Sequence, residues 1–153
     1  MKKAITMNVN GVSQQLEVEP WRMLLDVVRE ELDLTGAKLS CDIQVCGACT
    51  LLLDNRPVSS CTLLAFEARD CEVLTIEGLA QDNKLHPLQE AFITHGGFQC
   101  GFCTPGMILT AKTLLDENPK PTEEEVVQYM QGNICRCTGY KKIVESIIEA
   151  SKK

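Results

Sequence analysis

The sequence predicts an α+β fold of two units, in which a first unit of strands and one helix is followed by a second unit that is entirely helical. Apolar residues alternate with polar ones in several short segments before residue 77, which is typical of strands. After residue 85 the apolar residues recur at helical spacing, and the segment between the two patterns is polar and contains glycine. We therefore expect a first domain at residues 1–77, a linker at residues 78–84 and a second domain at residues 85–153.

The first domain is expected to begin with a β-hairpin and a helix. Residues 4–18 alternate polar and apolar side chains around Asn10-Gly11, a dipeptide that favours a tight hairpin turn. A second apolar pattern then follows helical spacing until Thr35-Gly36 ends it. The apolar residues of this helical pattern are Leu24, Val27, Val28 and Leu32.

Three further strands complete the first domain. Residues 50–53 and 58–61 are predicted to pair around a turn at residues 54–57, and residues 72–76 are predicted to form another strand. A loop that contains three cysteines separates the first helix from these strands. This order of hairpin, helix, cysteine loop and strands is that of an α+β unit.

Four helices are predicted in the second domain, and each has one apolar stripe that needs a partner, so we expect a small bundle. The helices span Pro87 to His95, Pro105 to Glu117, residues 123–131, and a last segment from Tyr140. Thr122 and Glu125 have the spacing of a capping box, and the acidic residues 123–125 suit the first turn of a helix. Thr104 and Thr138 are expected to be N-caps of the helices that follow them.

The composition is that of a globular protein and excludes several functional classes. A formal net charge of -6, from 15 basic and 21 acidic residues, argues against a nucleic-acid partner. No segment approaches the roughly 18 apolar residues of a membrane span, and residues 1–8 lack the apolar core of a signal peptide. We expect a cytoplasmic protein whose odd number of nine cysteines indicates metal ligands rather than disulfides.

Eight of the nine cysteines fall into two groups of four. The first group consists of Cys41, Cys46, Cys49 and Cys61. Its spacing, C-x4-C-x2-C with a later cysteine, is the one that plant-type ferredoxins use for a 2Fe-2S cluster. Gly47 and Ala48 would let the backbone approach such a cluster closely. Zinc is the competing metal, but structural zinc sites generally use two pairs of closely spaced ligands.

The second group consists of Cys100, Cys103, Cys135 and Cys137. Between its two halves lie 31 residues, predicted to form two helices, of which the first would extend about 20 Å and the second return as far. The cysteines would then lie at helix N-termini, which favour negative charge. This spacing is less diagnostic, so zinc remains an alternative. A Rieske centre is not supported, because His86 and His95 lie outside the motifs and are expected to be helix-end residues.

Three ordered motifs resemble those of one known family. They are Cys46-Gly-Ala-Cys-Thr50, Gln99-Cys-Gly-Phe-Cys-Thr-Pro-Gly106 and Gly132-Asn-Ile-Cys-Arg-Cys-Thr-Gly-Tyr140. They are similar to motifs of the small iron-sulfur subunit of the molybdenum hydroxylases, the family of xanthine dehydrogenase, aldehyde oxidoreductase and carbon monoxide dehydrogenase. The resemblance spans nearly the whole chain. It implies a β-grasp, ferredoxin-like 2Fe-2S domain followed by an all-α four-helix-bundle 2Fe-2S domain.

The resemblance also implies partners and a direction of electron transfer. The cluster on the second cysteine group would lie near the molybdopterin of a large subunit, and Gln99 and Cys137 would approach that cofactor. For Gln99, a hydrogen bond within its loop is the alternative. The cluster on the first group would pass electrons to FAD on a medium subunit, so the chain would be part of a hetero-oligomer.

One segment departs from the family pattern. Family members usually carry glycines around the first two ligands, whereas Ser40, Ile43 and Val45 occupy this loop here. The ligands are retained, so the departure concerns the conformation of the loop and its contact with a flavin partner rather than the identity of the cluster. The two hydrophobic residues are expected to shield the cluster, meet a partner surface or pack locally.

We interpret the chain as the electron-transfer subunit of an oxidoreductase complex, with no catalytic residue and no dinucleotide fingerprint of its own. The alternatives are a freestanding two-cluster ferredoxin shuttle and a zinc-stabilised interaction module. The remaining cysteine, Cys71, matches no ligand position. It is expected to be a small buried residue in a strand, with a redox-reactive thiol as the alternative.

Overall fold

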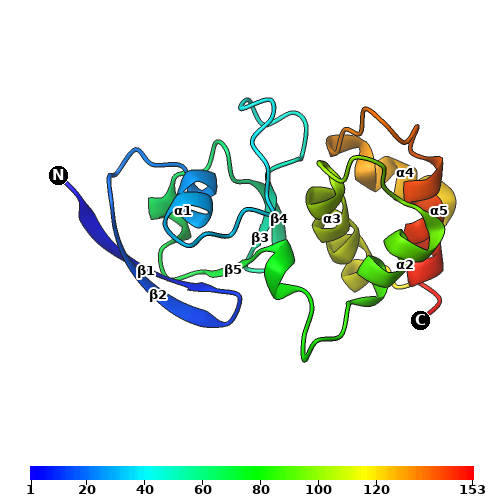
Figure 1. Cartoon of the computed structure of the whole chain (residues 1–153), viewed down its shortest axis with the longest axis horizontal. Coiled ribbons are helices and arrows are strands. Elements are labelled where there is room, and N and C mark those ends of the chain that lie inside the picture. Colours follow the sequence, from blue (N-terminus) through cyan, green and yellow to red (C-terminus); the bar gives the residue numbers. More distant parts are fainter.

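The computed structural model describes all 153 residues and confirms a mixed α+β protein with one five-stranded sheet. The strands are β1 (Lys3–Val9), β2 (Val12–Val18), β3 (Thr50–Leu53), β4 (Arg56–Ser59) and β5 (Glu72–Leu74). The α-helices are α1 (Leu24–Glu30), α2 (Pro87–His95), α3 (Thr104–Glu117), α4 (Glu123–Tyr129) and α5 (Lys141–Ala150). Three short 3-10 helices are η1 (Ala65–Ala68), η2 (Ile76–Gly78) and η3 (Met130–Gly132). The half with the sheet and the half with α2 to α5 lie side by side along the long axis of the molecule (Figure 1).

The sheet has the strand order β2-β1-β5-β3-β4. Strand β1 pairs antiparallel with β2 and parallel with β5, and β3 pairs antiparallel with β4 and β5. Alternate residues of β1, namely Ile5, Met7 and Val9, are buried and share a core with the apolar residues of α1. Because side chains alternate across a strand, this pattern turns one face of β1 toward the helix.

The first hairpin has the predicted turn, whereas the first helix is shorter than predicted. Asn10 and Gly11 have φ of 54° and 79° and form the two-residue turn that their sequence predicts. Helix α1 starts in the predicted segment but ends at Glu30, earlier than the predicted end at Gly36. The helix cannot continue because Asp33 has a left-handed φ of 60°.

Of the three later strands, β3 has its predicted bounds, β4 is shifted toward the N-terminus and β5 is shorter than predicted. Asp54 and Asn55 both have positive φ, 48° and 63°, so the second hairpin turns on two residues rather than four. This left-handed pair matches the twist of the flanking strands. Strand β4 therefore begins two residues earlier than predicted and ends before Cys61. The predicted end of the last strand is also wrong, because Ile76 begins η2.

All four predicted helices of the second half are present, with bounds at or close to the predicted ones, and one of the three predicted caps is confirmed. Helix α2 is confirmed at both ends, and His86 is its N-cap, with Nδ1 accepting from the Leu88 N–H at 3.2 Å. The capping box of Thr122 and Glu125 is present at the start of α4. Helix α4 ends at Tyr129, where the chain continues as η3. Both histidines thus lie at the ends of α2, as predicted.

Two predicted caps are wrong. The N-cap of α3 is Cys103, and Thr104 is the first residue of that helix. The N-cap of α5 is Tyr140, whose φ is 68°. Thr138 instead donates its hydroxyl to the sulfur of Cys135. A sulfur acceptor within the cysteine loop thus outcompetes the expected cap.

Two apolar cores of 15 buried residues each stabilise the two halves. The first core lies between the sheet and α1, and the second lies among α2 to α5. Leu79, which belongs to the predicted linker, is only 6% exposed and packs in the second core. Helix α3 also contacts β3, β4 and η2, so the halves meet along this helix.

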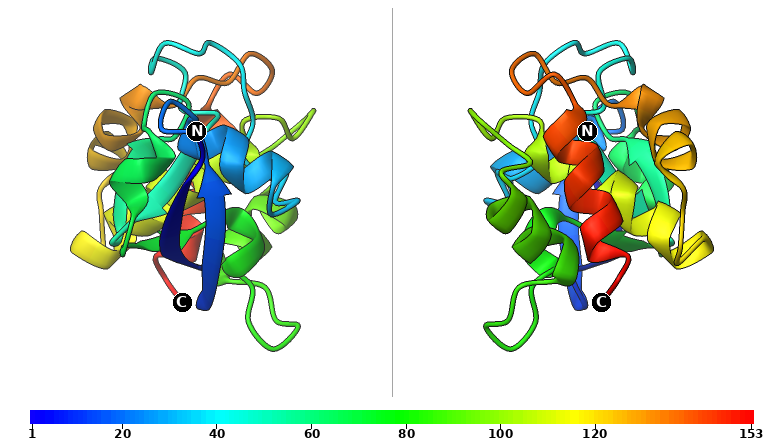
Figure 2. Two further views of the ribbon diagram at one scale, coloured as in Figure 1. Left: turned by 90° about the vertical axis from the view of Figure 1, so that its left-hand side faces the viewer. Right: turned by 90° about the vertical axis from the view of Figure 1, so that its right-hand side faces the viewer.

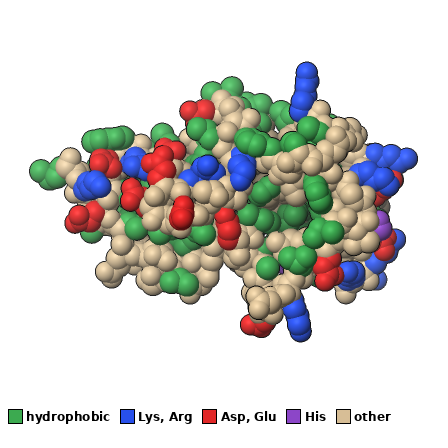
Figure 3. Space-filling model, in the orientation of Figure 1, with side chains coloured by type: hydrophobic (Ala, Val, Ile, Leu, Met, Phe, Trp, Pro, Cys, Tyr) green, Lys and Arg blue, Asp and Glu red, His purple; other side chains and the backbone are tan.

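The distribution of charge on the surface and the character of the helices bear on two expectations from the sequence, that of no nucleic-acid footprint and that of no membrane span. Acidic and basic side chains are interspersed on the face shown in Figure 3, and that face has no broad basic area. None of the helices has the length and apolar character that crossing a membrane requires.

Candidate iron-sulfur sites

The two cysteine groups lie in loops on the same side of the molecule. The loop of the first group (cyan) and the loop before α5 (orange) are uppermost in Figure 1 and in both views of Figure 2. Cys103 is at the N-cap of α3, in the second half. The fold therefore brings together segments that are far apart along the chain.

The first group joins two partly exposed loop cysteines to two buried ones. Cys49 and Cys61 are 2% and 4% exposed, whereas Cys41 and Cys46 are half-buried. The backbone N–H groups of Val45 and Cys46 each donate to Cys41 Sγ at 3.4 Å. Hydrogen bonds from backbone N–H groups, that of Ile43 first, lower the pKa of the Cys41 thiol to about 6, while burial raises the pKa of Cys49 to about 11. The backbone around Cys41 therefore stabilises negative charge on its sulfur.

The second group has a similar division. Cys100 and Cys137 are exposed, with their sulfurs 3.6 Å apart, and burial raises the pKa of Cys103 to about 12. Cys135 Sγ accepts from the Thr138 N–H at 3.4 Å and from its hydroxyl at 3.1 Å. Burial alone would raise the pKa of Cys135, but these hydrogen bonds outweigh it and lower the pKa.

Within each group the cysteine side chains neighbour one another, most closely in four pairs. Side-chain contacts link Cys41 with Cys46, Cys49 with Cys61, Cys103 with Cys135, and Cys100 with Cys137. Two pairs facing one another suit a cluster of two iron atoms, with one pair on each iron.

The second group surrounds a cavity of about 160 Å³. Most of its lining is hydrophobic or sulfur, which suits a compact cluster bound by thiolates. Its wall includes Ser40, Cys46 and Ala48 from the first half of the chain. All four cysteines of the second group line this cavity. The cysteine loop of the first domain therefore covers one side of the second site.

Comparison with known proteins decides the family. Residues 7–80 match the family described as "2Fe-2S iron-sulfur cluster binding domain", and residues 75–148 match the "[2Fe-2S] binding domain" family. The nicotinate dehydrogenase small FeS subunit of Eubacterium barkeri is 49% identical over 142 residues, which cover 93% of this chain and 90% of that protein. The chain belongs to the small iron-sulfur subunits of the molybdenum hydroxylases. It is an electron-transfer subunit of an oxidoreductase, with two 2Fe-2S-binding domains.

Other relatives place this iron-sulfur subunit in the same family. A probable xanthine dehydrogenase subunit of Bacillus subtilis is 43% identical over 145 residues, 95% of this chain and 83% of that protein. The crystal structure of quinoline 2-oxidoreductase from Pseudomonas putida 86 contains a chain with a TM-score of 0.96 and 44% identity, covering 99% of this chain and 94% of that one. The aldehyde oxidoreductase of Desulfovibrio gigas has a TM-score of 0.92 and 43% identity; the match covers 97% of this chain but only 17% of that longer one.

The loop that holds Cys41, Cys46 and Cys49 is called the first ligand loop. It has a left-handed backbone at several positions, although the glycines usual in the family are missing at most of them. Asp42 and Gln44 have φ of 57° and 62°, and Gly47 has φ of 68°. Asp tolerates this conformation through local hydrogen bonding, whereas Gln incurs a steric cost of about 1–2 kcal/mol. Ile43 and Val45 between them point outward and are 68% and 54% exposed, so local packing does not explain them.

Three further predictions concern single residues. Gln99 is exposed beside the exposed Cys100, so both are accessible to a partner. The predicted burial of Cys71 in a strand is wrong, because it is half-buried in a bend, with its sulfur 3.4 Å from the carbonyl of Arg69. Burial first, and then the carboxylate of Asp54, raise the pKa of Cys71, which disfavours a reactive thiolate.

Sequence reasoning missed two polar residues of the second site. The Tyr140 hydroxyl accepts from the Cys135 N–H at 3.1 Å, and Tyr140 holds a positive φ. Asn133 is a buried polar residue, 5% exposed, that contacts the first ligand loop. Both lie within the motif from Gly132 to Tyr140, but their contacts depend on the fold.

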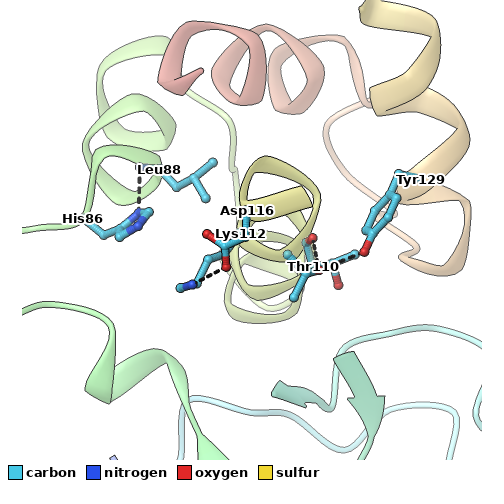
Figure 4. Close-up of polar contacts among 7 residues, drawn as sticks. His86, Leu88, Thr110, Lys112, Asp116 and Tyr129 are labelled. Carbon is cyan, nitrogen blue, oxygen red and sulfur yellow. Dashed lines mark hydrogen bonds and ion pairs between the residues drawn. The ribbon is translucent and has the colours of Figure 1, made fainter. Parts of the chain in front are cut away.

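The polar contacts on the far side of α3 are structural. Figure 4 shows Lys112 paired with Asp116. The Tyr129 hydroxyl donates at 3.1 Å to Thr113, which in turn donates to the Thr110 carbonyl. His86 caps α2 in the same view. Burial lowers its pKa, and its ring nitrogen is used in the cap. These residues serve helix packing rather than metal binding.

Proposed function

We propose that this chain carries electrons from a molybdopterin-binding large subunit, through its C-terminal site and then its N-terminal site, to FAD on a medium subunit. The observation that supports this most strongly is the arrangement of eight cysteines as four pairs at two adjoining sites. When bound, the two 2Fe-2S clusters supply carriers that accept and release one electron each. The relatives named as FeS and dehydrogenase subunits favour a subunit over a freestanding shuttle.

The exposed side of the second site is the proposed contact with the large subunit. Cys100 and Cys137 are exposed ligands, and the exposed Gln99 precedes the first of them. A partner that docks here would reach one pair of ligands directly, because the other pair, Cys103 and Cys135, faces the protein interior. We assign Gln99 and Cys137 to the approach toward molybdopterin.

The first ligand loop is the proposed contact with the flavin subunit. Ile43 and Val45 present hydrophobic side chains beside the partly exposed pair of Cys41 and Cys46. Covering them in a complex would remove apolar surface from water and shorten the distance to the next carrier. These residues would also keep water from the thiolates of the bound cluster.

The fold supports a division of labour between two domains. We propose a β-grasp domain at residues 1–77 and a four-helix bundle at residues 85–153, joined at residues 78–84, with one 2Fe-2S cluster in each. We also place the complex in the cytoplasm, because eight of the nine cysteines are assigned as cluster ligands rather than disulfides, and a reducing compartment keeps ligand thiolates available.

Purification of the chain with its native partners tests the proposal. We expect a coloured complex with two 2Fe-2S clusters per copy of this chain, together with molybdenum and FAD on larger subunits. A coloured chain that purifies alone would indicate a shuttle. A colourless chain with stoichiometric zinc would indicate an interaction module and contradict the proposal.

A further inference from the structure

Besides the packing of α3 on the sheet, the second half of the chain contacts two consecutive main-chain carbonyls of the first ligand loop, those of Cys46 and Gly47. The Ile134 N–H donates to the Cys46 carbonyl at 2.9 Å. The Asn133 side-chain Nδ2 donates to the Gly47 carbonyl at 3.3 Å. A Cβ added to Gly106 on α3 would lie 2.1 Å from the same Gly47 carbonyl oxygen, so only a glycine allows this approach. Two segments of the second half, the loop at Asn133 and Ile134 and the start of α3 at Gly106, thus converge on these two adjacent carbonyls of the first.

This contact links a proposed ligand of one site to a proposed ligand of the other. Ile134 is the residue before Cys135, and its N–H bonds directly to the carbonyl of Cys46. Cys135 and Cys46 are therefore connected by a few covalent bonds and one hydrogen bond. Cys46 also lines the cavity of the second cysteine group.

Asn133 is not needed to satisfy the carbonyl that it contacts. The Gly47 carbonyl already accepts from the Thr50 hydroxyl at 2.8 Å and from the Thr50 N–H at 3.2 Å. A carbonyl oxygen has two lone pairs. The third donor therefore contributes mainly a link between the halves. Asn133 itself is anchored, since its own N–H donates to the Met130 carbonyl of η3 at 3.0 Å.

The fit of Gly47 points to the same role. The sequence alone predicts that Gly47 lets the backbone approach a cluster. In the structure, a Cβ at Gly47 would lie 2.5 Å from Asn133 Nδ2 and 2.7 Å from the Gly132 carbonyl oxygen. The open space that glycine provides is therefore filled by the second half of the chain.

We propose that Asn133 is a positioning residue for electron transfer between the two iron-sulfur sites: by holding the Gly47 carbonyl, it keeps the neighbouring Cys46 carbonyl against the N–H of Ile134. In this step one electron leaves the reduced cluster of the second site and enters the oxidised cluster of the first. No bond is made or broken and no proton is transferred. The inference rests on the proposed function for the direction of transfer, but the contact itself is independent of direction.

Two variants test the contact from opposite sides in the purified complex. Asn133→Leu keeps the approximate size of the side chain and removes its donor, and Gly106→Ala inserts a methyl group against the Gly47 carbonyl. Thr113→Val is the matched control, because it removes a buried hydroxyl of the second half whose hydrogen bonds are to the Thr110 carbonyl and the Tyr129 hydroxyl rather than to Cys46 or Gly47. Substrate is mixed rapidly with oxidised complex, and the reduction of each cluster is followed by its electron paramagnetic resonance signal after freeze-quenching.

Reduction of the first cluster should be slower in both variants, on the order of tenfold, because small displacements between reacting groups cost rate steeply. Reduction of the second cluster, and the midpoint potentials of both, should remain those of the wild type. Hydrogen exchange of the segment containing the Ile134 N–H should become faster in both variants and stay slow in Thr113→Val. The magnetic interaction between the two reduced clusters should weaken in parallel.

The outcomes separate this inference from the function on which it rests. Wild-type complex that lacks two clusters, or whose second cluster is not reduced by substrate, would contradict the proposed function. Two intact clusters with wild-type transfer rates in both variants would overturn only the role of Asn133. A shift in either midpoint potential without a change in hydrogen exchange would also overturn it, since Asn133 would then tune a cluster rather than position a peptide.

Discussion

The two cysteine sites differ in how the protein prepares the same ligands. The first site is a loop without helix or strand, with left-handed residues and exposed hydrophobic side chains at its tip. The second site is built from a helix N-cap and a loop whose hydrogen bonds run to sulfur. Backbone N–H groups donate to sulfur at both sites, and the second site adds a hydroxyl donor and a helix end. The difference indicates that the two clusters are tuned by separate residues.

Loss of one ligand from each site should have the largest effect. Cys46→Ser and Cys100→Ser should each remove one cluster and about half of the iron, because metal binding contributes to folding of each domain. In the complex, Cys46→Ser should leave the second cluster reducible by substrate. Cys100→Ser should prevent substrate from reducing the first cluster. Iron analysis and resonance spectra of substrate-reduced complex measure both. Reduction of the first cluster in Cys100→Ser would reverse the assigned order.

The metal-free chain should distinguish the sites by thiol chemistry. Because the pKa of Cys41 is lowered to about 6, its thiolate predominates above that pH and is lost as the pH falls below it. Cys103, whose pKa is raised to about 12, stays protonated throughout the neutral range. Alkylation at pH 7, read by peptide mass spectrometry, should therefore label Cys41 far faster. Equal labelling of the two would contradict the described difference between the sites.

Removal of one hydrogen bond to sulfur should change only the second site. Thr138→Val loses the hydroxyl that donates to Cys135 Sγ, which stabilises the more negative reduced state. A hydrogen bond of about 1 kcal/mol corresponds to a decrease of roughly 40 mV in midpoint potential for one electron. Thr62→Val is the control, since the Thr62 hydroxyl bonds only oxygen atoms. A redox titration that shows equal potentials in both variants would exclude this tuning.

The smallest effect is expected in the first ligand loop. Gln44→Gly should raise the free energy of unfolding of the loaded chain by up to about 1 kcal/mol, because glycine adopts positive φ without a steric cost. Asp42→Gly should stabilise less, since Asp is tolerated in that region. Thermal unfolding measures both. A destabilised Gln44→Gly variant would show that the side chain contributes contacts that outweigh the backbone strain.

Local signals explain which parts of the fold were predictable. Asn10-Gly11 and the Thr122–Glu125 capping box act through neighbouring residues, so their sequence determines their geometry. The caps at Thr104 and Thr138 were wrong because a cysteine and a sulfur acceptor replaced the expected local bonds. The pattern of eight cysteines identified both candidate sites, and their ligand roles stay predictions.

The remaining part of the site depends on contacts that no local pattern encodes. Asn133 lies 86 residues from its partner Gly47, and neither residue carries a ligand atom. The absence of a side chain at Gly106 is required only because α3 approaches the first ligand loop there. Such residues resemble ordinary small or polar residues until the two halves are placed together.

The connection between the halves has a consequence for recombination. At the first ligand loop it consists of two main-chain carbonyls, one main-chain N–H group and one amide side chain, with glycines where the two segments cross. Main-chain atoms are the same in every relative, whatever the side chains nearby. Hybrid chains that combine the first half of one relative with the second half of another should therefore still transfer electrons between the two clusters, provided that Gly47, Gly106 and Asn133 are retained.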